Sequence, residues 1–519
     1  MDAGRREFLR YAAAVGVLLP WEPAWAGEAV FNVRDQGAAG DGVQAATKSI
    51  QTAIDVCAAA GGGRVYFPPG RYLSGTVYLK SGVHLYLEAG AVLLGSRELK
   101  DYPETVAAFR SYTDNYTDKS LIYGERLENV GIAGPGTLDG QGAAFKGPYK
   151  VRPYMLRLIE CRRVLVENVA FVDSPMWVQH YLACEDVHLR GVRVSSRCNE
   201  NNDGIDIDCC SRVRISDCDI SSGDDAIVLK STAARPCSDI TIANCVLSTL
   251  CSALKLGTES NGGFQNVVVS NCTMYDTRLA GIAVEMVDGG GLERVAFTGI
   301  TMKGVGTPLF IRLGDRARPF KAGMQRPPVG SLRDVLISNV IAVGGGAIGS
   351  SITGLPGYPV EGITLDNVRL GFTGGGTLAD GLKKVEELPS SYPEFSMFDR
   401  LPAYGIYCRH ARNVVLRNVE TRYETEDARP ALVCDDVEDL TVDAGAWRAH
   451  GSASAAIKLV DVRRAMIRDT RTTPGVRTLV RVEGRSSSGI DISRCSAGGA
   501  HRVCEAAPEV PAGLCGSNP

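Results

Sequence analysis

The sequence predicts an all-β fold, a single-stranded parallel β-helix with a short N-terminal capping helix. Strand-like segments of alternating β-branched residues return along most of the chain, as in 164–170, 240–247 and 363–370. Each segment contains an Asn, Asp or Gly near its end, and no amphipathic helix separates one from the next. Such repeats are typical of stacked solenoid coils. The alternation of apolar residues excludes leucine-rich and helical solenoids.

The turns of this repeat are marked by small polar residues at intervals of about 23 to 28 residues. They are Asn168, Gly191, Asp217, Asn244, Asn271 and Gly299. These residue types favour tight turns with a left-handed backbone, and stacked Asn side chains can hydrogen-bond along a ladder. The alternative fold is a β-sandwich, which needs hairpin turns that the sequence does not contain.

The first 26 residues have the pattern of a twin-arginine-type signal peptide. Arg5-Arg6 precede a short apolar stretch at 11–20 and the small-x-small sequence at 24–26. The alternative is a buried N-terminal helix. We therefore expect a mature catalytic domain of residues 27–519 that is periplasmic or secreted, with no membrane anchor once the signal is removed.

Residues 27–75 are expected to form the N-terminal cap and the first coils. Thr47 to Ala59 has helical apolar spacing and ends before a run of three glycines, so it can cover the open end of the solenoid. Two longer excursions, at about 315–330 and 375–405, interrupt the repeat. Long loops on a solenoid usually form walls over one face and carry binding functions.

Composition and charge narrow the functional classes. A net charge of -3 gives no reason to expect a nucleic-acid partner, and we expect a monomer without cofactor or metal. Of the 16 cysteines, several recur at one point of the repeat, where we expect them to stack inside as small apolar residues. They are Cys218, Cys245, Cys272 and Cys495. A disulfide between Cys504 and Cys515 is possible.

The acidic stretch from Cys198 to Asp225 is the candidate active site. Asp203 and Asp224 are separated by about one coil, so stacking would place their backbones roughly 4.8 Å apart. Carboxylates gathered this closely raise one another's pKa. Such a pair can supply one acid and one base on a single surface. The alternative is that these aspartates only cap turns.

These motifs resemble glycoside hydrolase family 28, the polygalacturonase-like enzymes of the right-handed, pectin-lyase-like β-helix fold. The family's Asn-Thr-Asp-Gly element matches Asn201-Asn202-Asp203-Gly204, and its Asp-Asp pair matches Asp224-Asp225. The likeness extends through FNVRDQGAAGDG, VYFPPGRYL, GPGTLDGQG and SPMW. By resemblance, Asp224 is the catalytic acid, and Asp203 and Asp225 hold and deprotonate a water in an inverting hydrolysis.

Two family elements are altered. The Gly-His-Gly element should fall near Cys251-Ser252-Ala253, where there is no histidine. The Arg-x-Lys element should fall at Arg312-Leu313-Gly314, which keeps the arginine and lacks the lysine. The resemblance implies that this basic pair grips a galacturonate carboxylate. Because the lysine is missing, other pectic substrates are plausible, such as rhamnogalacturonan-type chains or terminal sugar residues.

Further residues are candidates for substrate binding. Asn201 is expected to orient a carboxylate or a sugar hydroxyl, and Arg312 to bind a substrate carboxylate. The alternative for Arg312 is a surface ion pair with Asp315. Lys255 and Glu259 lie one coil beyond the Asp-Asp pair and are expected to line the same cleft.

Aromatic and alternating acidic residues complete the set. Trp177 is a candidate platform for stacking a sugar and is equally well explained as a core residue, and Tyr404 is a weaker candidate of the same kind. Asp206 and Asp208 alternate with isoleucines and share one face. Whether that face is the cleft or the interior depends on the bend at Gly204, and we favour a structural role for both.

The function expected is an exported inverting glycoside hydrolase that acts on a pectic or related acidic polysaccharide or its oligosaccharides. Loops that close one end of the cleft favour action on chain ends. Two rivals remain: a Ca²⁺-dependent lyase with an Arg or Lys base, and a non-catalytic carbohydrate-binding solenoid. If the protein is a lyase, its products should be unsaturated. If it only binds carbohydrate, Asp224→Asn should leave every measured activity unchanged.

Overall fold

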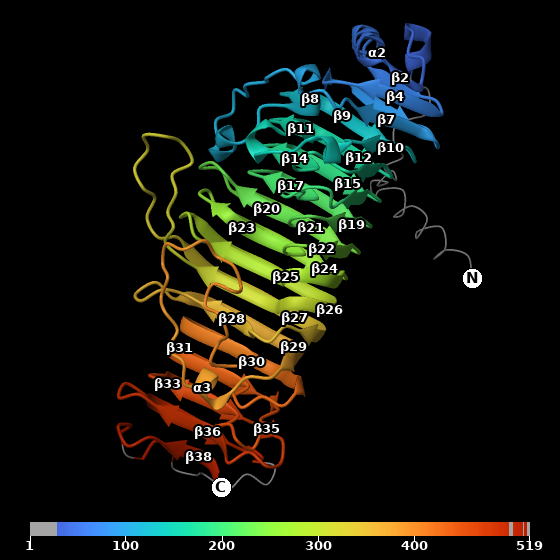
Figure 1. Cartoon of the computed structure of the whole chain (residues 1–519). Coiled ribbons are helices and arrows are strands. Elements are labelled where there is room, and N and C mark those ends of the chain that lie inside the picture. The colour runs from blue at the N-terminus through green and yellow to red at the C-terminus, as the bar shows by residue number, and fades with distance from the viewer. Residues whose placement is uncertain (1–28, 498–501, 512, 516–519) are drawn as a thin grey trace, which may run out of the picture.

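The chain folds into one long solenoid of parallel strands, as the repeat predicts (Figure 1). The computed structural model describes residues 29–497, 502–511 and 513–515, and the predicted signal peptide at 1–26 lies outside them. Within the described residues, 38 strands form one continuous ladder in which the strands of successive coils pair in parallel. The all-β parallel helix predicted from the sequence is confirmed.

Each coil contributes to three faces, which we number in the order the chain visits them. Face 1 contains β5 (Val77–Tyr78), β8 (Ser120–Glu125), β11 (Tyr154–Ile159), β14 (Gln179–Leu182), β17 (Ile205–Asp208), β20 (Ile227–Ser231), β23 (Leu254–Ser260), β28 (Ser350–Thr353), β33 (Ile457–Val460), β36 (Thr478–Glu483) and β38 (Arg502–Ala506). Face 2 contains β1 (Val30–Asn32), β3 (Gly63–Phe67), β6 (Val83–Leu87), β9 (Glu128–Ala133), β12 (Arg162–Glu167), β15 (Glu185–Arg190), β18 (Ser211–Ser216), β21 (Cys237–Ala243), β24 (Phe264–Ser270), β34 (Arg463–Arg468) and β37 (Ser488–Ser493).

Face 3 contains β2 (Asp41–Ala45), β4 (Gly70–Ser74), β7 (Ala91–Gly95), β10 (Thr137–Asp139), β13 (Ala170–Val172), β16 (Arg193–Ser196), β19 (Asp219–Ser222), β22 (Val246–Thr249), β32 (Ala446–Trp447) and β35 (Arg471–Thr472). Six long strands bend around the corners and contribute to more than one face. They are β25 (Thr273–Met286), β26 (Gly291–Leu313), β27 (Ser331–Gly345), β29 (Val360–Gly374), β30 (Ile406–Thr425) and β31 (Leu432–Asp443).

The corners between faces use the turn residues that the repeat predicts. All six of them have left-handed backbones, with φ between 54° and 65°. The predicted side-chain ladder is also present: the Asn418 amide donates to Asn367 Oδ1 at 3.1 Å, and the Asn367 amide donates to Asn339 Oδ1 at 2.8 Å. Short polar residues therefore fix the coil period.

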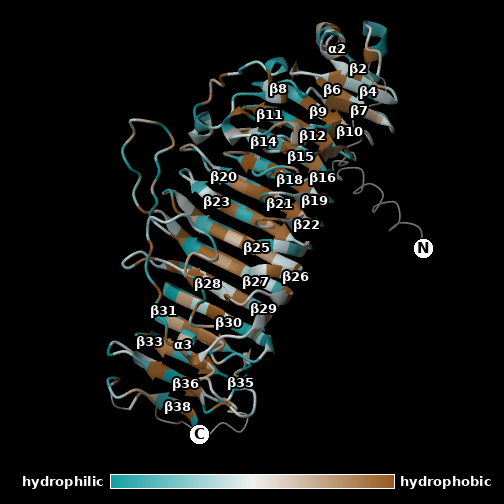
Figure 2. Ribbon diagram, viewed as in Figure 1, coloured by the Kyte–Doolittle hydropathy of each residue, from teal (hydrophilic) through white to brown (hydrophobic). Residues whose placement is uncertain are grey.

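The interior is filled by alternating apolar side chains, which appear as brown stretches along the strands in Figure 2. Cys218, Cys245 and Cys272 are buried in this core, as expected from their place in the repeat. Cys504 and Cys515 form a disulfide. The helix α2 (Thr47–Ala59) packs against β1, β3 and β5 and covers the first coils, as predicted.

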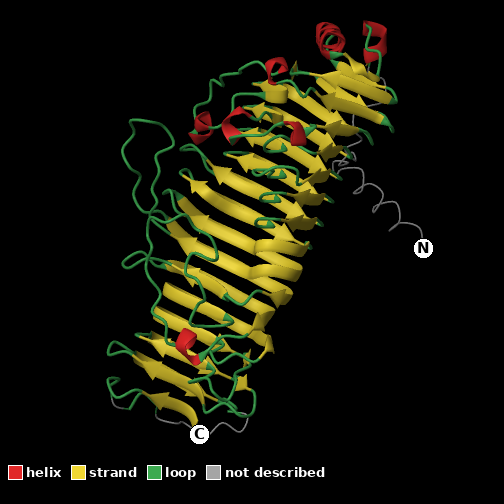
Figure 3. Ribbon diagram, in the orientation of Figure 1, coloured by secondary structure: helices red, strands yellow, loops and turns green. Residues whose placement is uncertain are grey.

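Two loops leave the solenoid where the sequence predicts them, and both are visible beside face 1 (Figure 3). One, at 314–330, connects β26 to β27, and the other, at 375–405, connects β29 to β30 and contains the short helix α3 (Leu378–Gly381). Both therefore enter or leave the solenoid next to face 1. Among the described residues, no helix is both long and apolar enough to cross a membrane.

Candidate active site

The aspartates of the candidate site lie where face 3 turns into face 1, in two consecutive coils. Gly204 N donates to Asp225 O at 2.9 Å, and Asp224 N donates to Asn202 O at 3.3 Å. These bonds place Asp203 beside Asp224 and Asp225. The predicted adjacency of the two motifs is therefore present in the structure.

The strands that follow these turns show which way the neighbouring side chains point. Ile205 and Ile207 belong to the apolar core, so Asp206 and Asp208 of β17 face outward. The strand register continues this outward row into the next coils, where Asp208 is opposite Lys230 of β20. Face 1 thus presents a row of charged side chains beside the aspartate turns.

Lys230 is the centre of one group of charges. Its Nζ lies 3.6 Å from Asp203 Oδ2, 3.6 Å from Asp206 Oδ1 and 3.7 Å from Glu259 Oε2. The ammonium also lies 4.7 Å from the centre of the Trp177 ring. All these side chains are buried, so the attraction between them is only weakly screened by solvent. One cation is thus shared by three carboxylates.

Asp203 and Asp206 compete for that cation. Burial, followed by the charge of Asp206, raises the pKa of Asp203 well above its usual range. The pKa of Asp206 is raised chiefly by burial, despite the nearby charge of Lys230. Within the described part of the chain, neither oxygen of Asp206 nor Oδ1 of Asp203 has a hydrogen-bond partner. This arrangement favours one proton held between the two carboxyl groups.

Asp224 and Asp225 differ in their environments. Asp225 Oδ2 lies 3.2 Å from Lys255 Nζ, and Asp225 Oδ1 accepts a hydrogen bond from Ser252 N at 3.2 Å. Asp224 Oδ1 accepts from Asp225 N at 2.9 Å. Burial and then the charge of Asp225 raise the pKa of Asp224. Asp225 is therefore ion-paired, and Asp224 has a pKa raised above the ordinary value of an aspartate.

Lys255 extends the network to the next coil. Its Nζ lies 3.5 Å from Glu285 Oε2, and Glu285 is 2 % exposed. Burial raises the pKa of Glu285 to about 7, which outweighs the opposing charge of Lys255. Asp225 and Glu285 thus share one ammonium, as Asp203 and Asp206 do.

The loop at 314–330 contributes two arginines to the site. Arg318 Nη2 donates to Glu259 Oε1 at 2.6 Å, and Arg316 Nε donates to Asp288 Oδ1 at 2.9 Å. Burial acts to raise the pKa of Glu259, but the charges of Lys230, Arg318 and Arg316 lower it to about 2. Glu259 is therefore held as a carboxylate.

The loop at 375–405 contributes an exposed aromatic ring. Tyr392 is 53 % exposed, with Lys255 Nζ 5.8 Å and the Arg316 guanidinium 5.4 Å from its ring centre. The exposed ring thus lies beside the Lys255–Asp225 pair.

A comparison with known families agrees with this architecture. The profile of "Glycosyl hydrolases family 28" matches residues 89–390, which is more than half of the chain and includes every acidic residue described above. The chain belongs to this family. A second profile, "Rhamnogalacturonase A/epimerase, pectate lyase-like", matches residues 30–129, before the site.

Curated relatives of the family match over shorter segments. A "Probable polygalacturonase" of Vitis vinifera is 34% identical over 215 residues, covering 38% of this chain and 43% of the relative. An "Exo-poly-alpha-D-galacturonosidase" of Dickeya chrysanthemi is 37% identical over 121 residues, covering 22% of this chain and 20% of the relative. The chain thus spans less than half the length of these curated relatives.

Solved structures share the fold. An exopolygalacturonase from Thermotoga maritima superposes with a TM-score of 0.59 at 23% identity, covering 75% of this chain and 92% of the other. A family 28 exopolygalacturonase from Yersinia enterocolitica gives a TM-score of 0.59 at 20% identity, covering 78% and 79%.

One predicted family 28 residue, Arg312, does not lie where the sequence places it. It belongs to β26, three strand pairings beyond β20, which is roughly 14 Å along the solenoid. Its guanidinium donates to the carbonyls of Gly354 (3.1 Å), Glu387 (2.5 Å) and Leu388 (3.3 Å), and it is 2 % exposed. The predicted position facing the aspartates is wrong, because Arg312 instead holds the base of the 375–405 loop.

The ion pair considered as the alternative for Arg312 is also not formed. Asp315 Oδ1 pairs with Arg326 Nη2 at 2.7 Å. The sequence distance between Arg312 and Asp315 suggests a pair, but the 314–330 loop folds back on itself and supplies its own partner.

Asn201 and Trp177 are near the site, but other groups already use their side chains. Asn201 Oδ1 accepts from Arg152 Nη2 at 2.9 Å. Trp177 is 4 % exposed, packed edge-on against Tyr116 and Tyr154 with Lys230 over its ring. Asn201 thus binds Arg152, and Trp177 lies against Lys230; direct contact with substrate stays a prediction for each.

Two other predicted residues have structural surroundings. Tyr404 is fully buried, and its hydroxyl donates to Arg448 O. Asp208 accepts from Thr232 N at 3.0 Å and Thr232 Oγ1 at 2.6 Å, and lies 3.2 Å from His180 Nε2. These contacts support the structural role expected for Asp208, whereas Asp206 directly contacts the cation shared with Asp203.

Lys230, Glu285 and Tyr392 are among the members of the site that the sequence pattern does not single out. A weak signal exists for Lys230, which is a charged residue at an alternate position of the otherwise apolar strand AIVLKS. For Glu285 and Tyr392 the local sequence offers none, because their role depends on which coil or loop lies beside Lys255.

Proposed function

We propose that this protein is an inverting glycoside hydrolase that acts on the ends of a pectic or related acidic polysaccharide or its oligosaccharides. The observation that carries the proposal is the meeting of Asp203, Asp224 and Asp225 where face 3 turns into face 1, with Asp225 ion-paired to Lys255 and the pKa of Asp224 raised by burial. Glycosidic hydrolysis needs two carboxyl groups in opposite protonation states. The names of the curated relatives support a pectic substrate.

In the proposed mechanism, Asp224 donates its proton to the leaving glycosidic oxygen. Asp225, held as a carboxylate by Lys255 and Ser252 N, takes a proton from the attacking water, which Asp203 helps to hold. The water attacks the anomeric carbon as the bond to the leaving oxygen breaks, which inverts the configuration. Glu259 stays ionised and keeps Lys230 in place beside Asp203.

Action on chain ends is supported by the 375–405 loop. Phe395 of this loop packs against Ala280, Ala283 and Phe310 on the outer side of face 1, and Arg312 binds the carbonyls of Glu387 and Leu388. These contacts hold the loop across face 1 on the C-terminal side of Lys255. A wall at that position blocks the cleft on its C-terminal side. A polysaccharide can then bind only with one chain end against the wall.

The charges of the site favour hydrolysis over a Ca²⁺-dependent lyase. Lys230 and Lys255 already lie 3.2–3.6 Å from Asp203 and Asp225, so the carboxylates are paired with ammonium groups. A lyase would need those oxygens for the metal. If the protein only bound carbohydrate, the raised pKa of Asp224 would serve no function.

Export and a monomeric state complete the proposal. They rest on the twin-arginine-type sequence at residues 1–26 and on a single chain that provides the whole site. Expression with the native N-terminus tests export: the mature protein should begin near Gly27 in the periplasmic or extracellular fraction. Light scattering should give the mass of one chain.

Product analysis tests the activity itself. The purified protein is incubated with homogalacturonan, rhamnogalacturonan and their oligosaccharides, and products are followed by chromatography, ultraviolet absorbance and NMR of the newly formed anomeric centre. We expect saturated products with inverted configuration, released from chain ends, and a loss of about 10²–10⁴-fold in kcat for Asp224→Asn. Unsaturated products would establish a lyase, and equal activity of Asp224→Asn would remove the proposed acid.

A further inference from the structure

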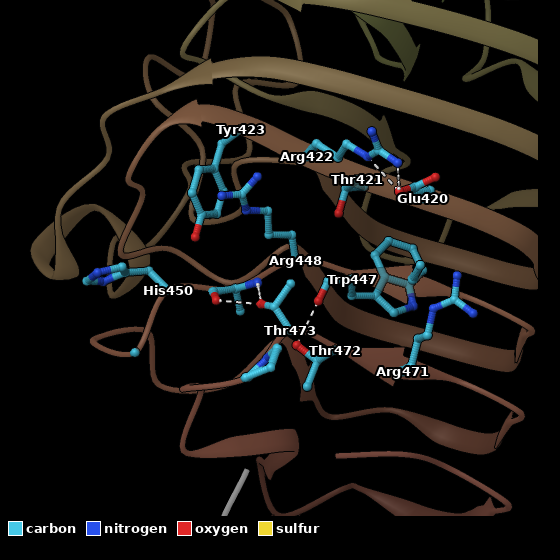
Figure 4. A pocket seen from close by; sticks show the side chains of 14 residues that line it. Glu420, Thr421, Arg422, Tyr423, Trp447, Arg448, His450, Arg471, Thr472 and Thr473 are labelled. Carbon is cyan, nitrogen blue, oxygen red and sulfur yellow. Dashed lines mark hydrogen bonds and ion pairs between the residues drawn. The ribbon is translucent and has the colours of Figure 1, made fainter. Parts of the chain in front are cut away.

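A hollow lies on the same long edge of the solenoid as the catalytic aspartates, several coils away from them. It has a volume of about 430 Å³ and is formed where face 3 turns toward face 1 in the coils of β30, β32 and β35 (Figure 4). Its lining residues include Glu420, Arg422, Tyr423, Arg448, His450, Arg471 and Thr473. We call it the arginine pocket.

The arginine pocket is separated from the active site by distance and by a wall. Six strand pairings connect β19, which precedes Asp224, to β30, which amounts to roughly 29 Å along the solenoid. The 375–405 loop leaves the solenoid between β29 and β30, before the pocket begins. The pocket is therefore not an extension of the catalytic cleft.

Two of its guanidinium groups carry charge that no carboxylate neutralises. Among the residues that the structure describes, no salt bridge or side-chain hydrogen bond involves the guanidinium of Arg448 or Arg471, and both residues are exposed. Elsewhere arginines of adjacent coils do pair, as Arg464 does with Asp439 at 2.7 Å and Arg494 with Asp469 at 2.6 Å. Of the arginines described in the pocket, only Arg422 pairs with a carboxylate, that of Glu420, and His450 Nε2 lies 3.4 Å from Glu426 Oε2.

The pocket also holds its groups in place. The Arg448 guanidinium lies 4.5 Å from the centre of the Tyr423 ring, which is 7 % exposed and fixed against Tyr404 (Figure 4). Thr473 Oγ1 donates to Ala449 O at 3.0 Å and accepts from Ala449 N at 3.2 Å, which ties the two coils together. An arginine stacked on a buried ring loses less freedom when it binds an anion.

We infer that the arginine pocket binds a carboxylate-bearing sugar of an acidic polysaccharide. Unpaired guanidinium groups match carboxylates with two parallel hydrogen bonds. A volume of 430 Å³ is within the range of small-ligand sites and exceeds what a simple inorganic anion requires. The choice of an acidic saccharide rests on the proposed function.

Such a site has a specific consequence for a polymeric substrate. A chain held at the arginine pocket is kept at a high local concentration near the cleft, although it does not enter the cleft there. Short oligosaccharides occupy the cleft alone and gain nothing from the pocket. The pocket should therefore lower KM for polymer and leave KM for short oligosaccharides and kcat for both unchanged.

Binding and kinetics together test this inference. Native gel electrophoresis in polygalacturonic acid, dextran sulfate or neutral dextran measures retention of the protein, with Asp225→Asn as the background so that the polymer is not cleaved. The test variant is R448Q/R471Q. The control, R214Q/R464Q, removes the same charge from exposed positions on face 2. A further single variant, Arg471→Gln, changes a guanidinium that forms no ion pair or side-chain hydrogen bond with the described residues, and it preserves the test if the double variant misfolds.

We expect polygalacturonic acid to retain the parent protein and the control, and to retain R448Q/R471Q at least about tenfold more weakly. On otherwise wild-type protein, KM for polymer should rise by a similar factor, with short oligosaccharides unaffected. Equal retention of the test and control variants would contradict binding at the arginine pocket. Retention by dextran sulfate but not by polygalacturonic acid, or retention by neutral dextran, would contradict recognition of a carboxylate-bearing sugar. Retention requires no catalysis, so a failure of the proposed hydrolysis leaves this result readable.

Discussion

The active-site cleft and the arginine pocket lie on one edge of the solenoid but treat charge in opposite ways. In the cleft, Lys230 and Lys255 are buried and each is surrounded by carboxylates. In the pocket, Arg448 and Arg471 are exposed and have no carboxylate partner among the described residues. The difference follows from solvent, because a buried charge must be compensated by the protein and an exposed one by water.

The charged residues of the cleft therefore interact mainly with one another, whereas the arginines of the pocket are free to interact with a ligand. The cleft residues set one another's protonation states, so a change in one alters several. The exposed arginines of the pocket contribute little to folding and are available for an incoming anion. Substitutions should therefore change stability and chemistry in the cleft, but only binding in the pocket.

The largest effect on stability is expected from Lys230→Met. The change leaves Asp203, Asp206 and Glu259 buried without their shared cation. Breaking a buried ion pair in this way costs about 3–5 kcal/mol, whereas Arg471→Met in the pocket should cost less than about 1 kcal/mol. Thermal and urea unfolding of the two variants measures the difference.

A second substitution checks the cause of that loss. Adding Asp206→Asn to Lys230→Met removes one of the stranded carboxyl groups, and we expect the double variant to be more stable than Lys230→Met alone. If the double variant were as unstable as the single one, lost packing of the lysine stem over Trp177 would explain the effect instead.

A smaller effect, dependent on pH, is expected from Glu285→Gln. The pKa of Glu285 is about 7 in the folded protein against 4.5 as its ordinary value, so the folded state keeps a proton that the unfolded state releases. Stability from this group is complete below about pH 4.5 and is lost as pH rises toward 7, by about 3 kcal/mol at most. Glu285→Gln should remove this slope.

Unfolding measured at pH 4.5, 6 and 8 tests the assignment. The decrease in stability between pH 4.5 and 8 should be smaller in Glu285→Gln than in the wild type. Glu424→Gln, which changes an exposed carboxylate, should keep the wild-type slope. A Glu285→Gln protein with the same slope as the wild type would assign the pH dependence to other carboxyl groups.

The sequence predicts the solenoid well because the features that determine this fold are local sequence patterns. Asn168, Asn244 and Asn271 fix left-handed turns, and the alternation of apolar residues fixes which side chains enter the core. Once the period is known, Asp203 and Asp224 must lie in neighbouring coils. The position of the acid pair therefore follows from the repeat.

The residues that surround the acid pair cannot be predicted from the repeat. Arg312 is assigned to the site by counting from a family motif, but three strand pairings separate its strand from β20. Tyr392 belongs to a loop that leaves the solenoid about 120 residues after Lys255, and the path of this loop brings the two residues together. The path of a long loop depends on tertiary contacts that no local pattern records.

The smallest effect is expected from Tyr392→Ala at the edge of the cleft. The ring is 53 % exposed and contacts the site through cation–π interactions with Lys255 and Arg316, so its loss should barely change stability. If the ring packs on a sugar, kcat/KM should fall several-fold, in line with about 1 kcal/mol for an aromatic contact.

Two comparisons isolate the stacking contribution. Tyr392→Phe keeps the ring and should retain most of the wild-type kcat/KM, whereas Tyr358→Ala removes an equally exposed tyrosine outside the cleft and should have no effect. A loss in Tyr392→Phe as large as in Tyr392→Ala would assign the contribution to the hydroxyl. Because the Tyr392 ring lies beside Lys255 and the arginine pocket lies in later coils, Tyr392→Ala should weaken action on short oligosaccharides and polymer alike, unlike R448Q/R471Q.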